Sequence, residues 1–189
     1  MRIIAGTKRR MKLLSPKTDV SRPITDRVKE SLFSLLYKYG LPKDKIVADL
    51  FCGVGSLGLE AISRGAKFTL FVEKDPTILK TLDKNREKAC FLDNSKVIKG
   101  DAFRIGAPVD VHEYELIFVD PPYRMARDTD IDSRLGQLLI RLNEQLAENG
   151  IVVVRTEKKI QLLQQYEQLQ IIERRQWGTM AVTILKKAK

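Results

Sequence analysis

A strand that leads directly into a glycine-rich turn constrains the fold of this chain more than any other feature. Residues 46–51 read Ile-Val-Ala-Asp-Leu-Phe, the composition of a buried strand, and Cys-Gly-Val-Gly-Ser-Leu-Gly follows at 52–58. Glycine lets the backbone turn tightly and approach a ligand closely, and a helix that starts in such a turn offers free N–H groups. The segment therefore predicts a strand, a ligand-binding turn that contains Gly53 and Gly55, and a helix.

An acidic residue placed twenty positions after Gly53 extends this pattern. Glu73 ends a second apolar run, and a carboxylate at that position can accept hydrogen bonds from both ribose hydroxyls of a nucleoside cofactor. The strand, the glycines and the acid together indicate a cofactor that contains a nucleoside. Both NAD and S-adenosylmethionine fit the pattern.

Strand-like and helical segments alternate along most of the chain. Apolar runs predict strands at 46–51, 68–73, 96–99, 115–119, 151–155, 170–174 and 181–185, and helical periodicity predicts helices at 25–39, 56–64, 76–91, 133–147 and 160–169. Such alternation builds βαβ units, so we expect an α/β, Rossmann-like fold with a mostly parallel seven-stranded sheet. The last strand is expected to run antiparallel because a short turn precedes it. Residues 2–5 and 11–14 predict an N-terminal β-hairpin ahead of the first helix.

The positive charge of the chain is concentrated at its two ends. Of a net charge of +10, residues 1–43 carry +8 and residues 158–189 carry +5, which leaves the middle slightly acidic. Basic ends of this kind favour an acidic partner, most often a nucleic acid. The candidate RNA contacts are the basic residues in and after the hairpin: Lys8, Arg9, Arg10, Lys12 and Arg22.

Length and composition indicate a soluble, cytoplasmic protein. At 189 residues we expect one domain, 1–189, made of a basic hairpin and helix extension at 1–43 and a cofactor-binding core at 44–189. The sequence contains no apolar stretch of the ~18 residues that a membrane helix needs, and its first residues lack the apolar core of a signal peptide. Two cysteines and one histidine provide neither a disulfide framework nor a usual zinc site, so no metal is expected.

Two aspartates at strand ends favour S-adenosylmethionine as the cofactor. Asp49 lies two residues before the first strand ends, where a carboxylate can take the amino group of a methionine moiety. Asp101 follows the third strand, where it and the backbone at Ala102 can meet an adenine amino group; it also suits the N-cap of a short helix. Phe51, at the end of the first strand, completes the candidate cofactor-binding set.

The segment Asp120-Pro121-Pro122-Tyr123 directly follows the fourth predicted strand. Two consecutive prolines donate no backbone hydrogen bonds and end the strand in a stiff turn. Asp120, which also borders the cofactor crevice, and the Pro121 carbonyl then present two acceptors side by side, and Tyr123 offers an aromatic face. This arrangement suits a planar base whose amino group has two N–H bonds to donate, so these four residues are the catalytic candidates.

The motifs together resemble the RsmD family of class I S-adenosylmethionine-dependent methyltransferases over essentially the whole chain. The resemblance is carried by Arg-Ile-Ile-Ala-Gly at 2–6, Arg-Pro-Ile-Thr-Asp-Arg-Val-Lys-Glu-Ser-Leu-Phe at 22–33, Asp-Leu-Phe-Cys-Gly-Val-Gly-Ser-Leu-Gly-Leu-Glu-Ala at 49–61 and Phe-Val-Asp-Pro-Pro-Tyr at 118–123. It implies transfer of a methyl group to the exocyclic N2 of one guanine in bacterial 16S ribosomal RNA. The implied partner is that RNA or the small ribosomal subunit, and we expect a monomer that uses no metal.

Three other functions use parts of the same pattern. An adenine-N6 DNA methyltransferase carries the same tetrapeptide, but 189 residues leave little room for a DNA-reading domain. An NAD-dependent oxidoreductase explains the glycine turn and Glu73, but it gives no role to the segment 120–123 or to the basic ends. A non-catalytic RNA-binding module that retained the sheet is the third alternative.

Overall fold

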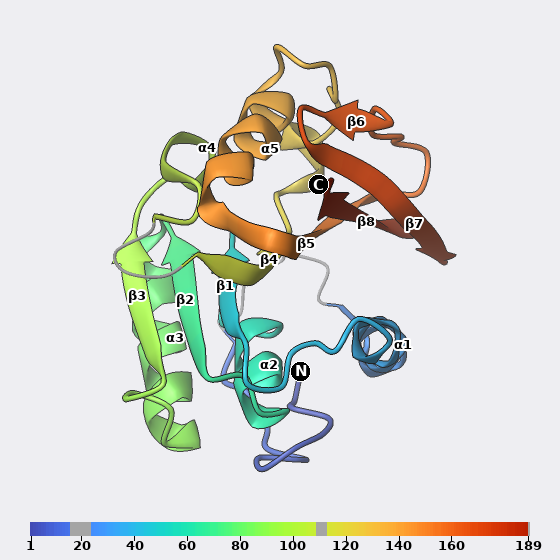
Figure 1. Cartoon of the computed structure of the whole chain (residues 1–189). Helices are drawn as coiled ribbons and strands as arrows, with labels where there is room; N and C mark the ends of the chain where they lie inside the picture. Colours follow the sequence, from blue (N-terminus) through green and yellow to red (C-terminus); the bar gives the residue numbers. More distant parts are fainter. Residues whose placement is uncertain (16–23, 109–112, 189) are drawn as a thin grey trace.

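A computed structural model describes residues 1–15, 24–108 and 113–188 of the chain (Figure 1). Within these residues, eight strands form one sheet in the order β3-β2-β1-β4-β5-β8-β7-β6. The strands are β1 (Ile46–Leu50), β2 (Phe68–Glu73), β3 (Ser95–Lys99), β4 (Tyr114–Val119), β5 (Leu146–Glu157), β6 (Gln165–Tyr166), β7 (Leu169–Trp177) and β8 (Met180–Lys187). Strands β1 to β5 pair in parallel, and β8 pairs antiparallel with β5 and β7. The expected parallel sheet with an antiparallel last strand is confirmed.

Helices cover both faces of this sheet. The helices are α1 (Asp26–Tyr37), α2 (Gly58–Ser63), α3 (Pro76–Ala89), α4 (Ala102–Ile105) and α5 (Arg134–Gln145), with a 3-10 turn η1 (Tyr123–Met125) after β4. Helices α1, α2 and α3 pack on one face, and α4 and α5 pack on the other. Because alternate residues of a strand point to opposite faces, the apolar runs of β1, β4 and β5 fill both cores at once.

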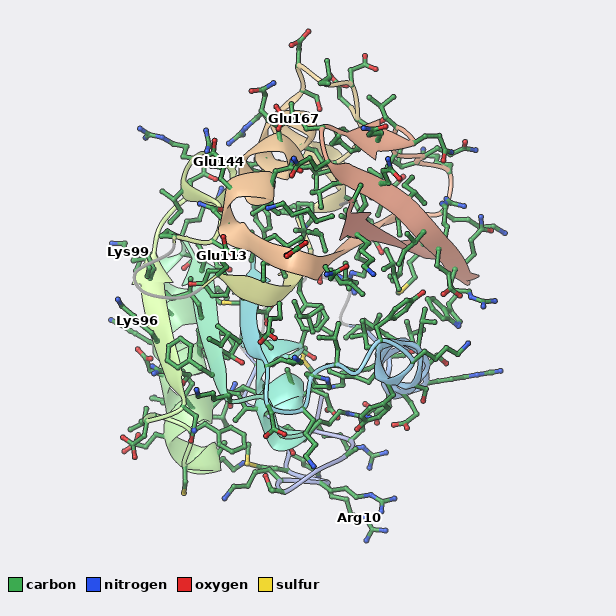
Figure 2. The ribbon with its side chains drawn as sticks, in the orientation of Figure 1. Arg10, Lys96, Lys99, Glu113, Glu144 and Glu167 are labelled. Atoms are coloured by element: carbon green, nitrogen blue, oxygen red, sulfur yellow. The ribbon has the colours of Figure 1, made fainter. Side chains whose placement is uncertain are left out.

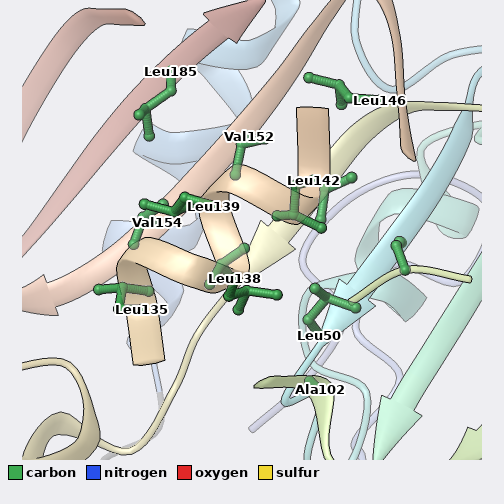
Figure 3. Close-up of a cluster of buried hydrophobic side chains, with 14 of the residues drawn as sticks. Leu50, Ala102, Leu135, Leu138, Leu139, Leu142, Leu146, Val152, Val154 and Leu185 are labelled. Atoms are coloured by element: carbon green, nitrogen blue, oxygen red, sulfur yellow. The ribbon is translucent and has the colours of Figure 1, made fainter. Parts of the chain in front are cut away.

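Helix α5 shows how the sequence pattern produces this packing. Its leucines at 135, 138, 139 and 142 recur at helical spacing and are fully buried against Val152, Val154 and Leu185 of the sheet (Figure 3). Ser133 caps the helix by accepting the Gly136 N–H at 3.0 Å. The helix ends at Gln145 rather than at residue 147, because Leu146 already belongs to β5.

The first thirteen residues fold back on themselves and lie on α2. Arg2 and Lys12 form an antiparallel bridge, so the expected hairpin is present as a single bridge rather than as two strands. Glu60 of α2 is fully buried and accepts the N–H groups of Ile4 and Ala5 at 2.8 and 3.0 Å. These hydrogen bonds fix the segment to the core of the protein.

Buried charges strengthen this attachment. Lys29 of α1 is fully buried; its Nζ donates to the Arg2 carbonyl at 2.7 Å and lies 3.4 Å from Glu60. Arg64 Nε donates to the same carboxylate at 2.8 Å. Burial lowers the pKa of Lys29, and the Glu60 charge opposes that change. Removal of one partner from such a buried group typically costs about 3–5 kcal/mol, so the three side chains hold α1, α2 and the first residues in one arrangement.

Two expectations are wrong at the C-terminal end. Residues 160–169 form no helix, because Leu162, Tyr166 and Leu169 reach the core from extended chain around the turn at Glu167, whose φ is 52°. The two-residue strand β6 adds an eighth strand to the seven that were expected within the described part of the chain. In the three described ranges, no helix combines the length and the apolar character needed to cross a membrane.

Candidate active site

The turn after β1 has a backbone conformation that few residue types adopt. Phe51, Gly53 and Gly55 have φ values of 59°, 55° and 89°, in the left-handed region. A Cβ on Gly53 would meet no atom within 4 Å, so the backbone faces open space at this position. A Cβ on Gly58 would lie 2.3 Å from a ring carbon of Phe71, so Gly58 allows close packing of α2 on β2. A ligand can therefore approach the chain at Gly53, whereas Gly58 serves the core.

Asp49 lies one residue before the end of β1, on the face covered by α2. The side chain is 1% exposed, and its Oδ2 accepts the Gly58 N–H at 2.7 Å at the start of that helix. Burial raises the pKa of Asp49 to about 8, and the negative charges of Asp120 and Glu73 act in the same direction. The carboxyl group is thus mostly protonated at pH 7, and a cation placed beside it would favour the ionised form.

Glu73 closes the glycine turn against the end of β2. One carboxylate oxygen accepts the Gly53 N–H at 3.1 Å, and the other accepts the N–H groups of Lys74 and Asp75 at 2.8 and 3.0 Å. An ionised carboxylate has about four acceptor sites, so it retains capacity for one further donor. The predicted acid thus lies beside the glycine turn at the carboxyl edge of the sheet.

Asp101 caps α4 and is part of an ion pair. Its Oδ1 accepts the Phe103 N–H at 3.1 Å, and its Oδ2 lies 3.0 Å from Arg134 Nη2. The Arg134 guanidinium stacks 4.5 Å from the centre of the Phe103 ring, and Phe51 meets that ring at 4.7 Å. Ala102 is 2% exposed beneath this group. The N-cap prediction for Asp101 is confirmed, and the tilted rings of Phe51 and Phe103 make this end of the site apolar.

The tetrapeptide that begins at Asp120 lies at the same carboxyl edge of the sheet. The Asp120 N–H donates to the Leu50 carbonyl at 3.4 Å, which ties the end of β4 to the end of β1. Pro121 is buried, Pro122 is exposed, and Tyr123 is half-buried at the start of η1. Burial raises the pKa of Asp120, and the positive charge of a neighbouring arginine opposes this.

That arginine is Arg155, which the sequence analysis did not identify. Its Nε donates to Asp120 Oδ1 at 2.6 Å, and its guanidinium carbon lies 5.9 Å from the centre of the Tyr123 ring. A signal was present in the sequence, because Arg155 interrupts the apolar run of β5 at the carboxyl end, where open α/β sheets bind their ligands.

The basic candidates of the hairpin lie elsewhere. The Thr7 N–H donates to the Ser63 carbonyl at 2.8 Å and the Lys8 N–H to its hydroxyl at 2.9 Å, at the end of α2 that is distant from Gly58. Figure 2 shows Arg10 at the outer margin of this segment. Arg9 is exposed, and the Lys12 carbonyl accepts a hydrogen bond from Lys88 Nζ at 2.8 Å. Arg22 lies outside the described residues.

In residues 1–15, 24–108 and 113–188, no group of three or more His, Cys, Asp or Glu side chains could hold a metal ion.

Comparison with solved structures defines the class of protein. The yhhF protein of Escherichia coli superimposes with a TM-score of 0.81 at 30% identity, covering 100% of this chain and 98% of that one. An RNA methyltransferase from Salinibacter ruber, solved in complex with S-adenosyl-L-homocysteine, superimposes with a TM-score of 0.65 at 17% identity over 89% of this chain and 95% of that one. The fold is that of a Rossmann-like class I methyltransferase, as expected.

Comparison of sequences defines the family. The family model described as conserved hypothetical protein 95 matches residues 1–186. Ribosomal RNA small subunit methyltransferase D of Haemophilus influenzae is 35% identical over 160 residues, which cover 84% of this chain and 79% of that protein. The chain belongs to this family, and the resemblance to the RsmD methyltransferases is confirmed.

Proposed function

We propose that this protein transfers a methyl group from S-adenosylmethionine to the exocyclic N2 amino group of a guanine in 16S ribosomal RNA. The observation that carries the proposal is the position of Asp120: a carboxylate at the carboxyl edge of the sheet, in a turn stiffened by two prolines and tied to β1 through Leu50. Relatives named ribosomal RNA small subunit methyltransferase D support the substrate class.

The residues at the edge of the sheet suit the cofactor. Asp49 has the place and the burial to pair with an ammonium group, and Glu73 retains acceptor capacity for ribose hydroxyls. Open space beside Gly53 leaves room for the cofactor. In this proposal Phe51 and Phe103 lie on one side of the adenine, and Asp101 accepts from its amino group.

The chemistry assigned to the protein is positioning and electrostatic stabilisation. When bound, S-adenosylmethionine supplies a methyl group on a sulfonium, which is already a good leaving group. The guanine N2 lone pair is delocalised into the ring, so the amino group is a poor nucleophile. Hydrogen bonds from its two N–H groups to Asp120 and to the Pro121 carbonyl localise that lone pair and stabilise the positive charge that develops on nitrogen. The methylated nitrogen then loses one proton to water, and S-adenosylhomocysteine leaves as a neutral thioether. Tyr123 stacks on the base once it has left its helix or loop.

RNA contacts away from the reacting base are assigned to the basic N-terminal segment. Lys8, Arg9, Arg10 and Lys12 lie along the hairpin beside the far end of α2, and Arg22 is assigned from the sequence alone. Because Lys8 lies at the Ser63 end of α2, away from the carboxyl edge of the sheet, the RNA has to reach both places across the surface of the protein. Its phosphates would then bind the basic side chains without sequence readout.

The test is methyl transfer to small-subunit ribosomal RNA by the wild-type protein and by two Asp120 variants. Asp120→Ala should retain cofactor affinity and lower the rate by about 10²-fold or more, the effect of losing one preorganised charge-stabilising group. Asp120→Asn keeps an amide oxygen as acceptor and should be measurably faster than the alanine variant.

Analysis of the methylated nucleoside separates the alternatives. N2-methylguanosine in the product supports the proposal, whereas methyl on adenine N6 in DNA would replace it with the DNA methyltransferase. Equal rates in both variants and in the wild type would reduce Asp120 to a turn residue. Wild-type protein that binds RNA and transfers no methyl group would be a non-catalytic binding module.

A further inference from the structure

Asp120 and Arg155 meet because of the register of the sheet. Val119, the last residue of β4, pairs with Val154 of β5. Asp120, directly after β4, and Arg155 of β5 are therefore neighbours as well. The side chains of Val119 and Val154 point to the face covered by α5, so the side chains of Asp120 and Arg155 point to the face covered by α1 and α2. The result is a contact of 2.6 Å between Nε and Oδ1, with side chains 11% and 19% exposed.

The contact occupies one oxygen of the carboxylate that the proposed function uses. Nε donates to Oδ1, so the rotation of the carboxyl group is restrained by a charge-assisted hydrogen bond. The same guanidinium lies 5.9 Å from the centre of the Tyr123 ring. One side chain therefore contacts both the proposed acceptor of the amino group and the proposed stacking ring.

We propose that Arg155 is a positioning residue for methyl transfer: it fixes the Asp120 carboxylate in orientation and in charge, and it sets the place of the Tyr123 ring. The proposal rests on the proposed function, because it assigns the role of Arg155 through the group that receives the amino N–H bonds. Arg155 itself is not placed in contact with the substrate.

The charge around Asp120 makes this role testable by pH. Asp49 on β1 interacts electrostatically with Asp120 and with Glu73 of β2, and Arg155 on β5 is the cation paired with Asp120. Burial raises the pKa of Asp120 and Arg155 lowers it. Without Arg155 the pKa of the Asp120 carboxyl would rise, so the group would stay protonated up to a higher pH. A protonated carboxyl is a poorer hydrogen-bond acceptor.

The experiment is a single-turnover rate profile from pH 6 to pH 9 with small-subunit ribosomal RNA and saturating S-adenosylmethionine. In Arg155→Met the acidic limb should move up by about one to three pH units, the effect expected for loss of an opposite charge at this distance. The rate should consequently fall most near pH 6 and recover in part near pH 9. Arg155→Lys keeps the charge and should retain a limb close to that of the wild type.

Two controls separate positioning from simple stabilisation. In an Asp120→Asn background, Arg155→Met should produce no shift with pH, because position 120 no longer titrates and the saturating cofactor keeps Asp49, which Arg155 also influences, ionised. Titration of the Asp120 side chain by carbon-13 NMR should show a higher pKa in Arg155→Met than in the wild type. S-adenosylhomocysteine titration confirms that each variant is folded.

The outcomes are distinct. A uniform rate loss at every pH, with the Asp120 titration unchanged, would overturn the role of Arg155 and leave only a structural ion pair. If the wild type transfers no methyl group while the NMR shift is present, the proposed function fails and the charge control by Arg155 stands. A shifted limb that requires the Asp120 carboxyl supports the proposal.

Discussion

Cofactor binding is expected to displace a proton from Asp49. This carboxyl group is 1% exposed and has a pKa raised to about 8, chiefly by burial. At pH 7 such a group is about nine-tenths protonated in the free protein. If the ammonium group of the cofactor binds beside it, the carboxyl ionises, and the complex should release about 0.9 proton per site.

The release of a proton from Asp49 makes the affinity for the cofactor depend on pH. Because only the ionised carboxyl pairs with the ammonium, affinity should fall as the pH falls below 8, and binding at pH 6 should be about ninefold weaker than at pH 7. S-adenosylhomocysteine is the suitable ligand, since it carries the same amino acid group and is chemically stable. Calorimetric titration at pH 7 in two buffers of different ionisation enthalpy gives the number of protons released.

Asp49→Asn provides the matched control. Its amide oxygen can still accept the Gly58 N–H, so the start of α2 should be retained. The variant should bind the ligand about tenfold to hundredfold more weakly, as expected when a charge-assisted hydrogen bond is removed, and with no dependence on pH between 6 and 7. Equal affinities at pH 6 and pH 7 in the wild type, with no proton released, would refute the pairing of Asp49 with the ammonium group.

Three further predictions concern the crevice and the hairpin. Glu73→Ala removes the acceptor of the Gly53 N–H and should weaken S-adenosylhomocysteine binding by about 1.5–3 kcal/mol; an unchanged titration curve in folded protein would exclude the ribose role. Gly58→Ala forces a Cβ to within 2.3 Å of the Phe71 ring and should lower the free energy of unfolding in urea by about 1–3 kcal/mol, whereas a stability equal to the wild type would show that α2 shifts freely. Replacement of Lys8, Arg9 and Arg10 by Gln should reduce the log–log salt slope of RNA binding by about 0.7–0.9 for each phosphate that is no longer neutralised, and it should leave cofactor affinity unchanged; a wild-type slope would make these charges a solvated surface.

The parallel part of the fold could be predicted because its signals are local and continuous. The strands β1, β2 and β4 are buried on both faces, so each is a mostly apolar run that stands out from the helices. Parallel pairing then brings the ends of these strands to one edge, which is why Asp49, Glu73 and Asp120 could be grouped before their positions were known. Their chemical roles remain proposals.

The segment at 160–169 could not be predicted, because two structures share its pattern. Leu162, Tyr166 and Leu169 are spaced as on one helix face, and all three are buried. In the fold they pack from extended chain, and Tyr166 uses its hydroxyl to donate to the Thr129 carbonyl at 2.6 Å and to accept the Leu163 N–H at 3.1 Å. The contact with Thr129 and the turn geometry depend on the tertiary structure, and the periodicity of the sequence does not reveal them.

Arg155 was missed for a related reason. A charged residue at the end of a strand is usually solvated, and its partner is 35 residues away in the sequence. Only the order β1-β4-β5 makes the two side chains neighbours. Strand order is a property of the assembled sheet, so the pairing becomes visible only in three dimensions.

The anchoring of the first residues on α2 has a consequence for the biosynthesis of the protein. Ile4, Lys8 and Leu14 hydrogen-bond side chains that follow them by 56, 55 and 71 positions in the chain. This segment therefore leaves the ribosome before α2 and α3, and it stays unassembled until both helices have been made. Contacts of such long sequence separation form late in folding, because the intervening loop must be closed before they contribute. The basic hairpin thus takes its final shape only on a chain whose glycine turn after β1 has already been synthesised.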